Sequence, residues 1–236
     1  MTARQVDLDR FYSLLVRLER RSGGKRRLSE CNGHMTWPNR GVYFFFEPGE
    51  FRSDGTTPRV VRVGTHALRA SNTTLWDRLS QHKGSTGGSM PFGGNHRGSV
   101  FRLHVGMALL KFGSWAPSIH NTWSKGSSAY SSIRHSEYPL EKEVSRYIGS
   151  MPFLCVEVPD PPSSSSDRGA IEAGAISLLS NFDRPPLDPS SDNWLGRMAD
   201  RHLIRESGLW NVNHVQDVSD GAFLDVFERY VQQVNG

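Results

Sequence analysis

Cysteine is scarce in this sequence, and long apolar runs are missing. Only Cys31 and Cys155 occur among 236 residues, and neither has a second cysteine nearby, so the sequence indicates neither a disulfide framework nor a zinc knuckle. The N-terminal residues MTARQVDLDR contain no apolar signal core, and no segment is long enough to span a bilayer. We therefore expect a cytoplasmic protein with reduced thiols and no membrane partner, and its oligomeric state stays open.

Acidic residues are almost absent from one long stretch of the chain. Between Gly55 and Lys111 the only acidic residue is Asp77. The basic residues of the same stretch are Arg59, Arg62, Arg69, Arg78, Lys83, Arg97, Arg102 and Lys111. A second basic group lies within residues 20–27. Positive charge gathered in this way suits a polyanion such as nucleic acid, although an ordinary solvated basic face would have the same composition.

The distribution of apolar residues predicts the fold class. With 36% hydrophobic and 10% aromatic residues, the chain can bury a core of its own. Periodicity and turn residues predict helices at 8–18, 74–82, 100–110, 140–148, 168–180 and 223–234, and strands at 41–46, 59–64 and 153–158. The Gly- and Ser-rich residues 84–98 and the polar residues 113–136 are expected to be irregular. This order predicts an α/β (α+β) chain with a small three-stranded mixed sheet flanked by helices.

Four side chains in this framework have chemistry suited to a reaction centre. Arg78 and His82 are four residues apart and share a face of one predicted helix, where an arginine can stabilise phosphate charge and a histidine can move a proton. Glu172 lies on a half-apolar helical stripe, where a carboxylate needs a partner such as a divalent cation. Tyr43 lies on an otherwise apolar strand.

Each of these residues also has an ordinary structural explanation. A pair such as Arg78 and His82 can simply lie on the surface. Glu172 can be favoured by the dipole at the start of its helix. A buried tyrosine such as Tyr43 usually directs its hydroxyl at a structural acceptor. The order of the residues along the chain is therefore more informative than any one of them.

That order resembles the GIY-YIG nucleases. The first predicted strand carries Gly41-Val42-Tyr43, and the second ends in Arg62-Val63-Gly64. The next helix carries Arg78 and His82 in the pattern Arg-x-x-x-His, and the helix after the third strand carries Glu172 and ends near Asn181. The resemblance covers roughly residues 41–181, and its main departure is Arg62 in place of the tyrosine of the second signature.

The resemblance implies a metal-dependent endonuclease that hydrolyses DNA phosphodiester bonds, of the restriction or phage-defence kind. Glu172 would hold Mg²⁺ or Mn²⁺, and Tyr43 would activate or orient the attacking water. Arg78 would stabilise the developing charge, and His82 would assist proton transfer. Arg62 would clamp a phosphate oxygen in place of the family tyrosine, and Asn181 would match the family's asparagine.

The resemblance also divides the chain and suggests where DNA binds. We expect a single domain over 1–236, with a GIY-YIG-like catalytic core at 41–181 and an N-terminal helical extension at 1–40. The C-terminal extension at 182–236 is a candidate for target recognition. The residues expected to bind DNA are Arg59, Lys83, His96, Arg97 and Arg102.

Two other functions remain open from the sequence. The chain could be a nucleic-acid-binding module of the same fold that has lost catalysis, and Arg62 is the feature that favours this reading. It could also be an interaction protein whose basic and aromatic residues bind a protein partner. Mg²⁺-dependent cleavage separates the first from a nuclease, and salt-dependent DNA binding separates the second.

Overall fold

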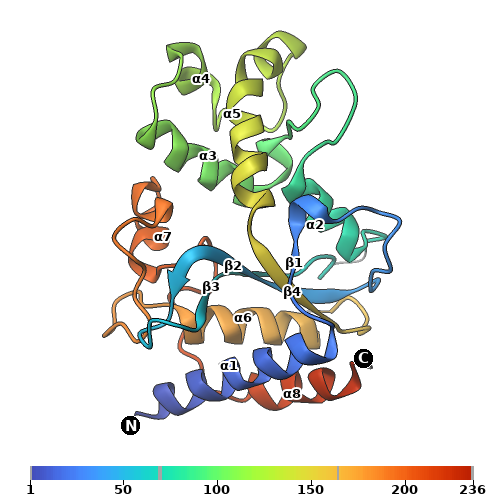
Figure 1. Ribbon diagram of the computed structural model, residues 1–236, viewed down its shortest axis with the longest axis vertical. Coiled ribbons are helices and arrows are strands. Elements are labelled where there is room, and N and C mark those ends of the chain that lie inside the picture. The colour runs from blue at the N-terminus through green and yellow to red at the C-terminus, as the bar shows by residue number, and fades with distance from the viewer. Residues whose placement is uncertain (1, 69–70, 164, 235–236) are drawn as a thin grey trace.

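The computed structural model describes residues 2–68, 71–163 and 165–234, so Arg69 lies outside the described residues. A four-stranded sheet runs through the middle of the molecule in the order β1-β4-β2-β3 (Figure 1). The strands are β1 (Arg26–Arg27), β2 (Gly41–Phe51), β3 (Pro58–Gly64) and β4 (Pro152–Glu157). Every pairing is antiparallel.

The prediction of a three-stranded mixed sheet was therefore wrong in strand number and in strand direction. The extra strand consists of Arg26 and Arg27, which pair with Phe153 and Pro152 at the sheet edge. Both arginines are exposed, so this strand has no apolar alternation that a sequence could display. It forms because the chain leaving the first helix runs beside β4.

One face of the sheet is covered by three helices. These are α1 (Ala3–Arg21), α6 (Asp167–Leu179) and α8 (Phe223–Gln233), which lie together below the sheet in Figure 1. Alternate residues of β2 pack against them, so that Phe44 meets Phe11 and Phe227. We call this side the lower face. The two ends of the chain are thus part of one apolar layer.

The opposite face, which we call the upper face, carries the helices from the middle of the chain. They are α2 (Leu75–Lys83), α3 (Val100–Phe112), α4 (Pro117–Thr122) and α5 (Ser131–Gly149). The other residues of β2, Tyr43 and Phe45, pack on this side with Phe101 of α3. The stretch 113–136, expected to be irregular, contains α4 and the first turns of α5, and α5 continues through Pro139.

Side-chain caps set the start of the two helices that matter most for the site. Thr74 caps α2 in a reciprocal capping box with Asp77. Ser166 caps α6 by accepting a hydrogen bond from the Gly169 backbone. Both caps satisfy backbone N–H groups that a helix start leaves free.

The C-terminal extension is attached along the open edge of β3. It contains α7 (His202–Ser207) and a 3₁₀ turn at Leu195–Met198, and two further 3₁₀ turns lie at Leu28–Glu30 and His96–Gly98. The Trp210 backbone N–H donates to the Val61 carbonyl, and the Asn211 side chain bonds both backbone groups of Val63. No helix in the described part of the chain is long and apolar enough to cross a membrane.

Candidate active site

A buried hydrogen-bonded chain joins β2, α2 and α3. The Tyr43 hydroxyl lies 2.8 Å from His82 Nε2, and His82 Nδ1 lies 2.8 Å from the Ser99 hydroxyl. Tyr43 and His82 are fully buried. Burial lowers the pKa of His82 well below its usual value, and the charges of Arg78, Arg62 and Arg102 lower it further. The imidazole is therefore neutral at pH 7 and can accept a proton from one neighbour while it donates one to the other.

Gly64 makes room for this chain. Tyr43 and Gly64 are directly opposite each other on β2 and β3. A Cβ atom at residue 64 would collide with the Tyr43 hydroxyl and ring. The glycine that ends the second signature is therefore needed for close approach of the tyrosine ring, and the two signatures meet as one structural unit.

Glu172 approaches the same end of β3 from the lower face. Its Oε1 atom accepts a 3.1 Å hydrogen bond from the backbone N–H of Thr65, the residue that follows Gly64. Burial raises the pKa of Glu172, while Arg62, the Thr65 bond, His214 and Arg78 oppose that rise. A carboxylate held by one backbone N–H among positive charges keeps oxygen lone pairs for another ligand.

Glu172 and Arg78 line one surface depression together. The residues around it are Thr65, His66, Ala67, Leu68, Ser71, Thr73, Arg78, Gln81 and Glu172. Arg78 donates to the Gln81 side chain at 3.0 Å, and it forms no ion pair within the described ranges. An uncommitted arginine opposite a carboxylate matches what a bound phosphate and a cation would require.

Arg62 lies inside the protein rather than on its surface. Its guanidinium donates to the Trp210 carbonyl at 2.6 Å and lies 4.7 Å from the Phe101 ring centre. Burial lowers the pKa of Arg62, whereas the neighbouring Tyr43 and Glu172 raise it. The structure thus brings Arg62 beside the candidate site, covered by the C-terminal extension.

Regular strand alternation does not hold around Arg62. Phe45 pairs with Arg62, but Phe46 pairs with Val60, so Val61 is an extra residue in β3. This bulge puts Val61 in the upper core and Val60 and Val63 in the lower core. Regular alternation would put Val61 and Val63 on one face, but the bulge shifts the period of the strand by one residue and separates them.

Asn181 is not brought together with the other candidates. It follows α6, nine positions after Glu172, and its amide donates to the Asp188 carbonyl while its oxygen accepts from Arg4 and from the Leu187 backbone. The Arg4 bond fastens the chain after α6 to α1, and the other two bonds hold the turn between residues 181 and 188 together. The structure therefore gives Asn181 a structural environment.

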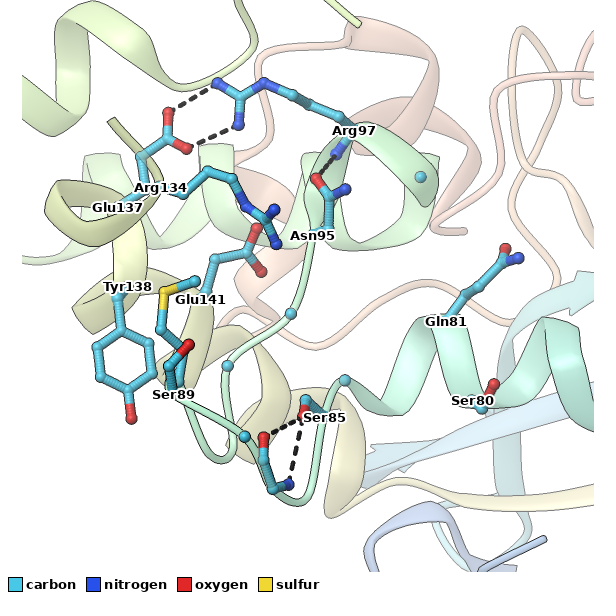
Figure 2. Close-up of a pocket in the computed structure, with 17 residues that line it drawn as sticks. Ser80, Gln81, Ser85, Ser89, Asn95, Arg97, Arg134, Glu137, Tyr138 and Glu141 are labelled. Atoms are coloured by element: carbon cyan, nitrogen blue, oxygen red, sulfur yellow. Dashed lines mark hydrogen bonds and ion pairs between the residues drawn. The ribbon is translucent and has the colours of Figure 1, made fainter. Parts of the chain in front are cut away.

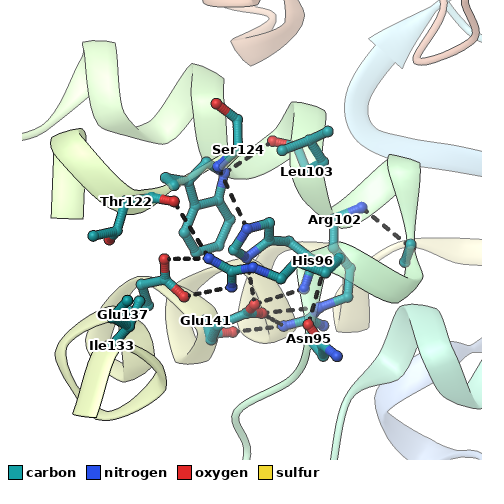
Figure 3. A network of polar contacts seen from close by, with 12 residues as sticks. Asn95, His96, Arg102, Leu103, Thr122, Ser124, Ile133, Glu137 and Glu141 are labelled. Carbon is teal, nitrogen blue, oxygen red and sulfur yellow. Dashed lines mark hydrogen bonds and ion pairs between the residues drawn. The ribbon is translucent and has the colours of Figure 1, made fainter. Parts of the chain in front are cut away.

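The residues expected to bind DNA do not share a surface either. Arg59 is buried in an ion pair with Glu50 at 2.6 Å, and Lys83 donates to the Cys31 carbonyl. The remaining three belong to a buried network under the loop that follows α2 (Figure 3). In it Arg97 pairs with Glu137 at 2.7 Å, while His96 and Arg102 both bind Glu141.

Two tryptophans of the C-terminal extension, the candidate for target recognition, also have structural partners. The indole N–H groups of Trp194 and Trp210 both donate to Glu47 at 3.1 Å. Glu47 is a buried carboxylate of β2, and burial raises its pKa. Trp194 and Trp210 therefore fasten the C-terminal extension to the sheet.

Sequence reasoning missed His66 and Thr65, which both line the depression beside Glu172. The His66 Nε2 atom lies 3.1 Å from the Asn39 carbonyl, and its Nδ1 atom is buried without a partner in the described structure. Burial lowers the pKa of His66. Their position in the sequence could have identified them, since both residues directly follow the signature that ends at Gly64.

A divalent metal would depend on Glu172 alone. Within residues 2–68, 71–163 and 165–234 no three His, Cys, Asp or Glu side chains gather into a metal-binding group. Mg²⁺ often keeps several waters and takes only one or two carboxylates. Glu172 has the oxygen donor that such an ion prefers, so the residues fit a water-rich Mg²⁺ or Mn²⁺ site and do not fit a zinc site.

Comparison with other proteins identifies the family of the chain. Neither curated proteins nor solved structures gave a match to the chain. The family model for the GIY-YIG domain matches residues 2–236, and therefore includes both terminal segments as well as the four-stranded sheet. GIY-YIG proteins are in general endonucleases that act on DNA. The chain belongs to the GIY-YIG family.

Proposed function

We propose that this protein is a metal-dependent endonuclease that hydrolyses DNA phosphodiester bonds. The observation that carries the proposal is the convergence of two groups at the end of β3. Glu172 and Arg78 line one depression, and the Tyr43–His82 pair lies behind Gly64, one residue from Thr65 of that depression. Family membership supports a nuclease function in general.

The side chains would divide the reaction among them. Arg78 binds the scissile phosphate and stabilises the charge that develops on it. The Tyr43 oxygen would take a proton from the attacking water as its own hydroxyl proton moves to Nε2 of neutral His82. Glu172 is the residue that would hold Mg²⁺ or Mn²⁺, and such an ion supplies Lewis-acid stabilisation of phosphate charge when bound.

Arg62 would take over part of the role of the family tyrosine. An arginine cannot exchange a proton at neutral pH, so it contributes only charge and hydrogen bonds. Its neighbours Tyr43 and Glu172 are the groups that this charge acts on. It would stabilise negative charge on the Tyr43 oxygen, and it would keep Glu172 ionised against the effect of burial.

The biological role would be restriction or phage defence in the cytoplasm. The basic stretch between Gly55 and Lys111 supports DNA as the partner, even though several of its arginines are used in internal ion pairs.

The first experiment incubates the purified protein with supercoiled plasmid DNA in Mg²⁺, in Mn²⁺ and in EDTA. Nicked or linear DNA is expected with either metal, and none is expected with EDTA. A protein that binds the DNA without cutting it under any metal would contradict the nuclease proposal. That result would favour the binding module, which the complete burial of Tyr43 and the presence of Arg62 make the second candidate.

Arg78 provides a sharper test of the site. Arg78→Ala is expected to slow single-turnover cleavage by about 100-fold or more, because charge stabilisation of this kind is typically worth about 10²–10³ in rate. DNA affinity should fall much less. If affinity fell while the single-turnover rate stayed equal to wild type, Arg78 would be a backbone contact only.

A further inference from the structure

A second cavity lies beside α2, next to the depression that holds Glu172. It measures about 690 Å³, and we call it the loop cavity. Its walls are α2 and α5, and its floor and rim come from the glycine-rich loop at residues 84–98 (Figure 2). This size falls within the range of roughly 300–1,000 Å³ that is common for sites of small organic ligands.

The loop cavity adjoins the candidate active site. Gln81 of α2 lines both the loop cavity and the depression that holds Glu172. Gly98, on the cavity wall, accepts a long hydrogen bond of 3.5 Å from Arg78. A DNA strand that has one phosphate bound at Arg78 would therefore place its next nucleotide in the loop cavity.

The acidic side chains of the cavity are neutralised by their own partners. Glu137 binds Arg97 through both carboxylate oxygens, at 2.7 and 2.9 Å. Glu141 accepts from the backbone and side chain of His96 and from Arg102 Nε at 3.0 Å (Figure 3). These two carboxylates have their charge committed to the wall behind them, so they do not leave the cavity acidic.

Arg134 is the exposed cation of this cavity. Figure 2 shows its side chain extending from α5 toward the wall that carries Asn95. Within the described residues Arg134 forms no ion pair, and the same is true of Arg78 at the neighbouring site. Two uncommitted arginines thus flank a cavity whose interior is neutral, as the two phosphates on either side of one nucleotide require.

The interior can contact both the flat face and the polar edge of a nucleotide base. Tyr138 and Met90 supply apolar surface on the lining. Gln81 and Asn95 supply carboxamides whose nitrogen atoms donate no hydrogen bond within the described part of the chain. The Asn95 oxygen is already held by the Arg97 backbone at 3.1 Å, which leaves its amide N–H groups for acceptors such as the carbonyl oxygens and ring nitrogens of a base.

The loop is fixed in place by glycines that pack against the network. A Cβ atom at Gly94 would collide with the Arg102 guanidinium, and one at Gly93 would lie 2.9 Å from the Tyr138 ring. By contrast, Cβ atoms at Gly87 and Gly98 would meet nothing within 4 Å. The loop is thus packed closely at Gly93 and Gly94, and it leaves open space at Gly87 and Gly98.

We propose that the loop cavity binds one nucleotide of the substrate strand, adjacent to the scissile phosphate, with its base inside the cavity and its phosphate on Arg134. The base leaves the helical stack to enter, which costs a few kcal/mol in duplex DNA. This inference rests on the proposed nuclease function.

The first test uses leucine substitutions that are intended to occupy the loop cavity and to leave the fold unchanged. Gly98→Leu extends into open space, and Ser13→Leu puts the same side chain on the exposed surface of α1, on the lower face. With a duplex containing a cleavage site mapped on plasmid DNA, Gly98→Leu is expected to cleave at least tenfold more slowly than wild type. Ser13→Leu is expected to cleave at the wild-type rate. Gly87→Leu, also on open space in the same cavity, serves if Gly98→Leu does not fold.

A substrate that lacks one base gives the complementary result. Duplexes with a single abasic position are prepared at each nucleotide next to the cut. At one position the missing base should slow wild type, and the same substrate should restore at least part of the rate of Gly98→Leu, because the leucine then occupies vacated space. If Gly98→Leu and Gly87→Leu both match Ser13→Leu on intact DNA, the inference is overturned and the nuclease function stands.

Arg134 is tested by the salt dependence of binding in EDTA, with a labelled 30-base-pair duplex of mixed sequence. Arg134→Gln should reduce the slope of log affinity against log salt by about one, and Arg134→Lys should retain it. An unchanged slope in Arg134→Gln would remove the phosphate from the proposal. A wild-type protein that neither binds nor cuts DNA would instead refute the proposed function itself.

Discussion

The two faces of the sheet are covered by different kinds of side chain. The core of the lower face, between the sheet and α1, α6 and α8, consists of apolar side chains, and the ion pair of Arg17 with Glu228 beside it is partly exposed. One buried ion pair lies at the start of α6, where Arg168 contacts Asp160 at 2.7 Å. The upper face contains apolar residues of the same kinds together with buried charges and histidines, among them His82, Arg102 and Glu141. Both faces share the strands of one sheet, so the difference does not come from the architecture.

The buried polar groups of the upper face lie on the side of the proposed Tyr43–His82 reaction centre. Apolar side chains stabilise a fold when they are buried. A buried polar group lowers the stability of the fold unless each of its hydrogen-bond partners is present. Arg102 joins the two buried groups of the upper face, because it binds Glu141 and donates to the backbone carbonyl of His82 at 2.8 Å. The network therefore holds the end of α2, and with it the histidine that faces Tyr43.

The largest effect is expected where the two faces meet, at Glu172. Glu172→Gln should leave DNA affinity nearly unchanged and reduce cleavage by about three orders of magnitude or more, because a metal ligand is lost. Exposed Glu206 supplies the control, and Glu206→Gln should cleave normally. Single-turnover assays of the three proteins decide this, and undiminished nicking by Glu172→Gln would remove Glu172 from the mechanism.

The same variant has a stability signature. Burial raises the pKa of Glu172 above 4.5 in the folded state, so the folded protein binds this proton more tightly than the unfolded chain. Stability from this group is present at low pH and is lost as the pH rises through the raised value. In EDTA, Glu172→Gln should therefore become the more stable protein as the pH rises from 4 to 7, as measured by urea midpoints.

The second effect compares buried and exposed carboxylates directly. Glu141→Ala leaves Arg102 and His96 without their partner, and breaking a buried pair typically costs about 3–5 kcal/mol. Glu228→Ala removes the partner of Arg10 and Arg17 on the lower side, where partly exposed pairs are worth about 0–1 kcal/mol. Urea unfolding of both variants measures the difference, and equal losses would contradict the contrast between the two faces.

The sequence predicted the parts of the molecule that depend on local pattern. The strands at Tyr43 and Arg62 and the helices at Arg78 and Glu172 are present near their expected bounds. The order of the signatures predicted that these elements adjoin one another, as they do at the end of β3. In each case, apolar periodicity or a short motif carried the information.

Long-range contacts account for what the sequence did not predict. Arg59, Arg97 and Arg102 were expected to bind DNA, but each is neutralised by a carboxylate at least nine positions away in the sequence. Nothing in a single sequence marks which Glu will pair with which Arg. The two-residue strand β1 and the bulge at Val61 likewise depend on neighbouring chain segments rather than on local composition.

A third comparison uses two buried tyrosines. Tyr43→Phe removes the hydroxyl that bonds His82, and Tyr12→Phe removes the hydroxyl that accepts a 3.1 Å bond from the Val60 backbone. Each leaves a buried polar group unsatisfied and should cost about 1–3 kcal/mol of stability. Only Tyr43→Phe should also lose cleavage, by about 100-fold or more, because general acid–base catalysis contributes typically about 10²–10⁴. Normal cleavage by a destabilised Tyr43→Phe would mean a purely structural role.

The smallest effect concerns two helix caps that differ in one respect. Ser99 caps α3 and Ser166 caps α6, and replacing such a cap with alanine costs about 1 kcal/mol. Ser99 also bonds His82 Nδ1 at 2.8 Å, so Ser99→Ala leaves a buried imidazole nitrogen without a partner. Its loss of stability should exceed that of Ser166→Ala by about 1 kcal/mol. Ser99→Ala should further lower the cleavage rate without changing DNA affinity, because Ser99 acts as a positioning residue that holds the ring of His82 toward Tyr43. If the two serine variants were equal in both stability and rate, the hydrogen bond to His82 would have no part in either, and the buried chain would end at the imidazole.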